Sequence, residues 1–137
     1  MLLQADEELR VNSNPTYALL LAFMACDGAA VDYLRGVKEM KGLSKSAIDK
    51  YDAQPSMARR LNIDLPLLMP EFDDRKMATV RAIDAVRRKR NGIVHSGDSA
   101  TAAEAAAAIK AANDFVKLLG KHCLYDRHWV GQKKGPA

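Results

Sequence analysis

The residues best suited to chemistry lie in one short stretch, Arg87-Arg88-Lys89-Arg90-Asn91-Gly92-Ile93-Val94-His95. His95 follows Arg90 by five positions, and Asn91 comes directly after the arginine. Histidine is the side chain type that most readily exchanges a proton near neutral pH. The planar, permanently charged guanidinium of arginine matches phosphate oxygens. These residue types together fit RNA cleavage without a metal, which needs a base for the ribose 2′-OH, an acid for the leaving 5′ oxygen and a fixed positive charge.

The spacing of the motif limits its geometry. On a continuous helix of about 3.6 residues per turn, five positions correspond to roughly 500°, which leaves Arg90 and His95 about 140° apart. Asn91 and His95, four positions apart, would share one face and could hydrogen-bond. Gly92 can distort the last turn of the helix, so the direction of His95 is not fixed by the sequence. The wide angle predicts a cleft that a second surface completes.

An arginine followed after four residues by a histidine, with a polar residue next to the arginine, resembles the defining motif of the HEPN family of α-helical domains. The specific part of the resemblance is Arg90-Asn91-Gly92-Ile93-Val94-His95, and the helical pattern extends it over roughly residues 15–120. Many family members are metal-independent ribonucleases. The resemblance implies that His95 acts in proton transfer and Arg90 stabilises the phosphoryl transition state. Asn91 would orient one of them or hold the scissile phosphate.

The same resemblance implies partners and products. A homodimer would bring two copies of the motif together at a two-fold axis. RNA would be cut to a 2′,3′-cyclic phosphate and a 5′-OH. Because family members commonly serve as toxins or antiviral effectors, a cognate antitoxin or inhibitor protein would be a further partner. An acidic residue on the early helix often orients the catalytic pair in the family, and Asp27 is the best match. Asp27 could equally be an acid that pairs with a cation on a neighbouring helix.

Positive charge is concentrated beside the motif. The chain carries a net charge of +4, yet residues 75–95 hold seven cations and one acid, so the remainder is slightly acidic. Such a distribution is typical of proteins that bind a phosphate backbone. Arg87, Arg88 and Lys89 are the candidate RNA-binding residues.

Two non-catalytic interpretations of the motif remain open. The basic run could be a solvated helix face whose cations interact with the helix dipole, for about 0.3–1 kcal/mol. The chain would then be a non-catalytic helical module that binds nucleotide, RNA or a protein partner. Alternatively, Arg90 and His95 could hold a structural dimer together.

Three long helices are predicted to position these residues. Asn14-Pro15 is a favoured start for the first, which should run to about residue 35 or beyond. Asp73-Asp74 opens the motif helix, and Thr101-Ala102-Ala103-Glu104 fits a capping box that opens the last, from about residue 102 to 121. A shorter helix should start at Ser44, and residues 57–61 should form another turn or two. The two prolines in residues 62–70 predict a loop or a short helical turn there. The fold class is therefore all-α, an up-down bundle of four to five helices.

Composition limits the remaining possibilities. The 137 residues are 48% hydrophobic and predict one globular domain over residues 1–130, with a disordered tail at 131–137. Cys26 and Cys123 are far apart and outside any metal-ligand spacing, so we expect neither a metal nor a cofactor. Acids near the start and the lack of an apolar stretch of about eighteen residues predict a cytoplasmic protein without membrane contact.

Overall fold

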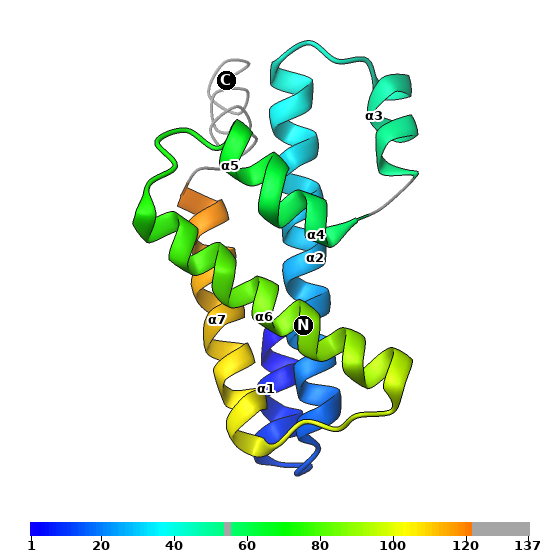
Figure 1. Ribbon diagram of the computed structural model, residues 1–137, viewed down its shortest axis with the longest axis vertical. Helices are drawn as coiled ribbons and strands as arrows, with labels where there is room; N and C mark the ends of the chain where they lie inside the picture. Colours follow the sequence, from blue (N-terminus) through cyan, green and yellow to red (C-terminus); the bar gives the residue numbers. More distant parts are fainter. Residues whose placement is uncertain (54–55, 122–137) are drawn as a thin grey trace, which may run out of the picture.

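The computed structural model describes residues 1–53 and 56–121, and these form a helical bundle in which no strand occurs. Four helices build it: α1 (Leu2–Arg10), α2 (Pro15–Met40), α6 (Asp74–Ser96) and α7 (Ala102–Lys121). Figure 1 shows that α1, α2, α6 and α7 alternate in direction, with α6 crossing the others obliquely. The predicted all-α up-down bundle is confirmed. The short elements α3 (Lys45–Asp52), α4 (Met57–Arg59), a π-helical turn η1 (Arg60–Asp64) and α5 (Leu65–Leu68) connect α2 to α6.

Helix α2 is the central helix of the bundle and begins where the sequence predicts. The Asn14 side chain accepts the backbone N–H of Tyr17 at 3.2 Å, and Pro15 takes the first helical position, where a missing N–H costs nothing. Gly36 lies inside the helix and does not weaken it enough to end it. Gly42, with a φ of 88°, lies in the turn that follows, where its positive φ is tolerated.

The core is built largely from small side chains. The most extensive packing in the bundle joins α2 and α7. Buried residues on α7 recur at alternating three- and four-residue steps, namely Ala105, Ala108, Ala112, Phe115 and Leu119. Buried alanines on both α2 and α7 are small enough for the two backbones to approach closely, and Phe115 and Leu119 are the large buried side chains of α7. Ile109 and Val116 of α7 are only half-buried.

The motif helix α6 is capped at both ends. The Asp73 side chain accepts the backbone N–H of Lys76 at 2.9 Å, and Gly97 closes the helix with a φ of 72°. The helix passes through Gly92 without interruption, so the distortion considered at this glycine does not occur. The continuous helix fixes the angle between Arg90 and His95 at about 140°.

The turn after α6 is held at its far end. The Thr16 hydroxyl of α2 accepts the Ala100 N–H at 2.9 Å. The predicted capping box is confirmed, because Glu104 accepts the Thr101 N–H at 3.0 Å and Thr101 accepts the Glu104 N–H at 3.1 Å. These bonds position the end of the motif helix against the rest of the bundle.

Gly28 of α2 is exposed, and a Cβ added there would meet no atom within 4 Å, so no other element packs closely against this glycine. The predicted disordered tail at residues 131–137 and Cys123 lie outside the described residues.

Helix α2 is long and apolar enough, by length and composition alone, to cross a bilayer. The expectation that no stretch of the chain approaches a membrane span therefore does not hold for α2. Half of its most apolar window is buried inside the bundle. The central position among α1, α6 and α7 accounts for this apolar composition, since a buried core helix is hydrophobic over most of its surface.

Candidate functional site

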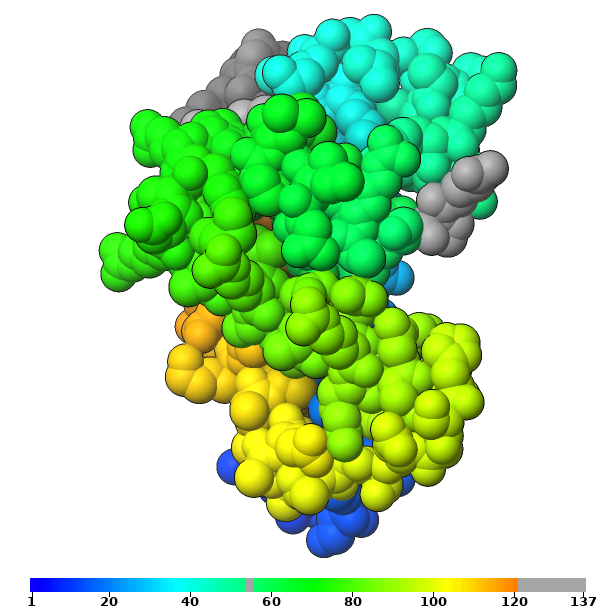
Figure 2. Space-filling view, viewed as in Figure 1, coloured from blue at the N-terminus to red at the C-terminus, as the bar shows by residue number. Residues whose placement is uncertain are grey.

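A hollow of about 310 Å³ opens where α6 passes α2 and α4. It is lined by Phe23, Asp27, Ser56, Met57, Ala58, Arg60, Arg87, Arg90 and Asn91. In Figure 2, α6 crosses the front of the molecule directly below the α4–α5 segment. The structure thus brings together four of the predicted site residues, Asp27, Arg87, Arg90 and Asn91, although Asp27 comes from a different helix.

Arg90 is held in place by two contacts. Its guanidinium carbon lies 5.3 Å from the centroid of the Phe23 ring, over the aromatic face. Its Nη1 donates to Asn91 Oδ1 at 3.1 Å. Asn91 therefore bonds to its neighbour and not to His95, the partner that the four-residue spacing allowed. Arg90 also lines the hollow, and its guanidinium has further N–H donors that an anion bound there can use.

Arg87 is fixed by a buried acid. Asp84, 6% exposed, accepts from Arg87 Nε at 2.8 Å, pairs with Arg88 Nη2 at 3.1 Å, and accepts from Asn62 at 3.5 Å. Burial alone would raise the pKa of the Asp84 carboxyl, but the bond from Arg87 and the charges of both arginines lower it below its ordinary value. A carboxylate that stays ionised keeps Arg87 oriented at the edge of the hollow.

Asp27 pairs with a cation that sequence analysis did not single out. Its Oδ1 lies 3.4 Å from Nη1 of Arg60, the first residue of the π-helical turn. Of the two interpretations of Asp27, an ion pair with a neighbouring element is the one present. Asp27 lines the same hollow as Arg90, so the predicted place beside the motif arginine and the ion pair with Arg60 occur together.

His95 lies outside this hollow. It is exposed on the last turn of α6 and makes no side-chain hydrogen bond or ion pair with any residue in the described part of the chain. Its position on α6 is one turn beyond Asn91 and on nearly the same face, because four positions correspond to about 400°. The imidazole is therefore open to a molecule that extends from the hollow along the end of α6.

The two other candidate RNA-binding residues point in different directions. Arg88 has a side chain that is 75% exposed and is anchored only by Asp84. Lys89 lies on the α7 side of the helix, where Nζ pairs with Glu104 at 3.3 Å beside an alanine-lined groove. Arg88 is accordingly the freer of the two for a phosphate backbone, and Lys89 has a structural partner.

A carboxylate that sequence reasoning missed lies against the motif. The Asp98 N–H donates to the Gly92 carbonyl at 3.3 Å, and a Cβ at position 92 would collide with the Asp98 carboxylate. Gly92 is thus explained by the close approach of the following turn. A rotation of the Asp98 side chain could relieve the collision, since the clashing atom is the end of that side chain.

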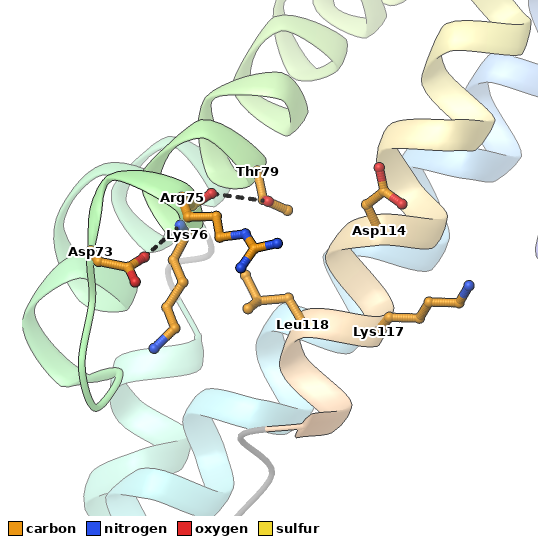
Figure 3. Close-up of a pocket in the computed structure, with 7 residues that line it drawn as sticks. All are labelled: Asp73, Arg75, Lys76, Thr79, Asp114, Lys117 and Leu118. Atoms are coloured by element: carbon orange, nitrogen blue, oxygen red, sulfur yellow. Dashed lines mark hydrogen bonds between the residues drawn. The ribbon is translucent and has the colours of Figure 1, made fainter.

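A larger hollow, of about 510 Å³, lies between the start of α6 and the end of α7 and contains none of the predicted site residues. Figure 3 shows its charged side chains pointing in different directions. Asp73 caps α6, Lys76 Nζ donates to the Pro70 carbonyl at 3.1 Å, and Asp114 pairs with Lys110. Most of its charged groups are therefore engaged in holding the fold.

No group of three or more histidine, cysteine, aspartate or glutamate side chains within the described ranges could hold a metal ion. Cys26 is buried, and burial together with the adjacent Asp27 charge raises the pKa of its thiol to about 12. Cys26 is therefore a poor nucleophile and serves as a small core residue.

We expect Asp84→Asn to destabilise the fold by about 1–3 kcal/mol at pH 7, because Arg87 loses a charge-assisted bond. The folded pKa of Asp84 is depressed, so its stabilisation is present above the unfolded pKa, about 4, and is lost as the pH falls through the folded value. Urea unfolding at pH 7 and pH 3 measures this. The control Asp114→Asn, which removes an exposed pair, should cost less than about 1 kcal/mol. Equal losses at both pH values would contradict the assignment.

No family model, curated protein or solved structure matches the chain. The interpretation of the fold and of the hollow therefore rests on the residues of this chain and their contacts.

Proposed function

We propose that the protein is a metal-independent endoribonuclease of HEPN type. The observation that supports this best is the clustering of Arg87, Arg90 and Asn91 around one hollow, with His95 exposed one turn farther along the same helix. Cations and an amide that line one hollow are suited to bind a phosphate, and the exposed imidazole supplies a group that can transfer protons.

The reaction follows from the residue types. A phosphodiester in the hollow would accept hydrogen bonds from the free donors of Arg90, which would stabilise the charge that builds up on the non-bridging oxygens. His95 would take the proton from the ribose 2′-OH as the 2′ oxygen attacks phosphorus. The 5′ oxygen then leaves with a proton from a second acid, which gives a 2′,3′-cyclic phosphate and a 5′-OH.

The second acid is the reason that the proposal includes a homodimer. One chain presents a single motif histidine, and His95 is exposed on the last turn of α6. In a two-fold dimer with the ends of α6 at the axis, the partner's His95 would lie across the same cleft. A toxin or antiviral effector of this kind would be restrained by an antitoxin or inhibitor protein.

The alternative proposal is a non-catalytic module that binds RNA or nucleotide. The observation that favours it is the position of His95 outside the hollow, since the hollow can then hold a phosphate with no base beside it. Both proposals use the same cations, so RNA binding alone does not separate them.

Incubation of the purified protein with labelled single-stranded RNA and a chelator separates the two. The nuclease proposal predicts cleavage without divalent metal and product ends that are 2′,3′-cyclic phosphate and 5′-OH. Cleavage that requires added metal, or products with 3′-OH ends, would contradict the mechanism. A folded protein that binds several RNAs without cutting any would support the module.

A further inference from the structure

Arg60 is a buried cation that lines the hollow. Its side chain is only 5% exposed, and it comes from the π-helical turn that faces the motif helix across the hollow. The Leu65 N–H donates to the Arg60 carbonyl five residues back, which defines the wider turn. Such turns are rare, and they occur frequently at functional sites.

The only side-chain partner of Arg60 among the described residues is weak. Nη1 lies 3.4 Å from Asp27 Oδ1, a distance at the long end for a hydrogen bond, and the Asp27 side chain is 45% exposed. A guanidinium has five N–H donors, and no nitrogen of Arg60 is both fully buried and without a partner. The donors that Asp27 does not bind therefore reach the surface, where an anion can accept from them.

The hollow in front of Arg60 has the charge of an anion site. Three arginines line it, Arg60, Arg87 and Arg90, against the single carboxylate of Asp27. Asp84 neutralises part of Arg87 from outside the hollow. A phosphate with two non-bridging oxygens can accept from both Arg60 and Arg90, whereas Asp27 bonds Arg60 and has no bond to Arg90.

We propose that Arg60 binds an RNA phosphate and that Asp27 is its displaceable counterion. In the free protein Asp27 pairs with Arg60, and on RNA binding a phosphodiester takes its place while Asp27 turns towards solvent. This inference deepens the proposed function, because it names the residue opposite the motif helix that holds the RNA backbone. Arg60 is a binding residue here, and no proton passes through it.

Binding affinity for a short single-stranded RNA tests the inference in chains that also carry His95→Ala, so that cleavage does not interfere. Arg60→Gln should weaken binding about ten-fold or more, since a charge-assisted bond is lost. The slope of log affinity against log salt should fall by about 0.7, the value for one phosphate contact on a single strand. Asp27→Asn should strengthen binding several-fold, because the competing carboxylate is removed.

Arg59→Gln is the matched control. Arg59 is the preceding residue and carries the same charge, but its guanidinium lies 4.9 Å from the Tyr51 ring and 4.0 Å from Asp64, outside the hollow. It should weaken binding only through long-range charge, by less than about three-fold. Equal losses for Arg59→Gln and Arg60→Gln would overturn the inference.

Stability measurements keep the test decisive. If Arg60→Gln does not fold, Asp27→Asn and Arg60→Lys take its place, since both retain a cation at position 60. A purely structural ion pair predicts that Asp27→Asn lowers the melting temperature and leaves RNA affinity unchanged, which would also overturn the inference. If binding depends on Arg60 but the protein never cuts RNA, the nuclease proposal is refuted and this inference stands. If Arg60→Gln changes neither cleavage nor binding, this inference is refuted and the nuclease proposal stands.

Discussion

His95→Ala is expected to reduce metal-independent RNA cleavage by about 10²–10⁴-fold, the contribution typical of one general acid–base group. The loss should appear in the rate of the chemical step, while RNA affinity changes little, because the hollow that would hold the phosphate does not include His95. Single-turnover cleavage with protein in excess over labelled RNA measures the chemical step directly.

Because His95 is exposed, His95→Ala should leave the fold unchanged. His95 lies on the last turn of α6 and contacts no described residue through a hydrogen bond or ion pair, so its removal leaves no buried group without a partner. The melting temperature and the oligomeric state should match those of the wild type. Val94→Ala, which alters the exposed neighbour on the same turn, is the control and should keep its activity.

Two other outcomes have distinct meanings. Equal cleavage by wild type and His95→Ala, prepared in the same way, would indicate a contaminating nuclease or a different catalytic group. A His95→Ala protein that no longer dimerises would favour the structural role for this residue. Neither result would change the conclusion that the fold is a helical bundle.

Local signals explain why so much of the fold follows from sequence. Helix starts are predicted from short-range signals, which are caps at Asn14 for α2 and Thr101 for α7 and a pair of acids at residues 73–74 for α6. Each of the three starts carries a cap bond. Such bonds join residues three positions apart, so they depend little on the rest of the chain. The order of long helices then left few arrangements other than an up-down bundle.

The connecting segment was less predictable. Residues 57–68 form a short α-helix, a π-helical turn and another short helix, where the two prolines indicated only a loop or turn. Leu61 and Leu65 are fully buried, and Arg60 and Asp64 are buried with them. Tertiary packing selects this conformation, and helix propensity carries no signal for it.

The candidate site shows the same division between local and long-range information. The contact between Arg90 and Asn91 joins neighbours in the chain, and the motif pointed to both. The pairing of Asp27 with Arg60 spans 33 positions and depends on how α2 passes the π-helical turn. No spacing rule connects such residues, so Arg60 had no signal in sequence beyond its charge. Phe23 is a buried core residue whose ring also contacts the Arg90 guanidinium, another long-range contact that spacing does not predict.

Arg90 provides the second large effect. Arg90→Ala is expected to reduce cleavage by about 10²–10³-fold, the cost of removing one preorganised donor to a developing oxyanion. Arg90→Lys should recover only part of the loss, since an ammonium keeps the charge but lacks the planar fork. Because the guanidinium also covers the Phe23 ring, Arg90→Ala should cost about 0.5–1 kcal/mol of stability, which chemical unfolding detects.

Arg81→Ala is the matched control, since it removes an exposed arginine from the same helix outside the hollow. Its effect should be a modest loss of affinity that disappears at high salt, because a distant charge acts only through the long-range field. The loss at Arg90 should persist at high salt, since contact with the transition state is short-range. If the activity lost in Arg90→Ala returns to the wild-type level at high salt, Arg90 acts only through the long-range charge of the helix. The hollow would then be better explained as part of a non-catalytic binding module.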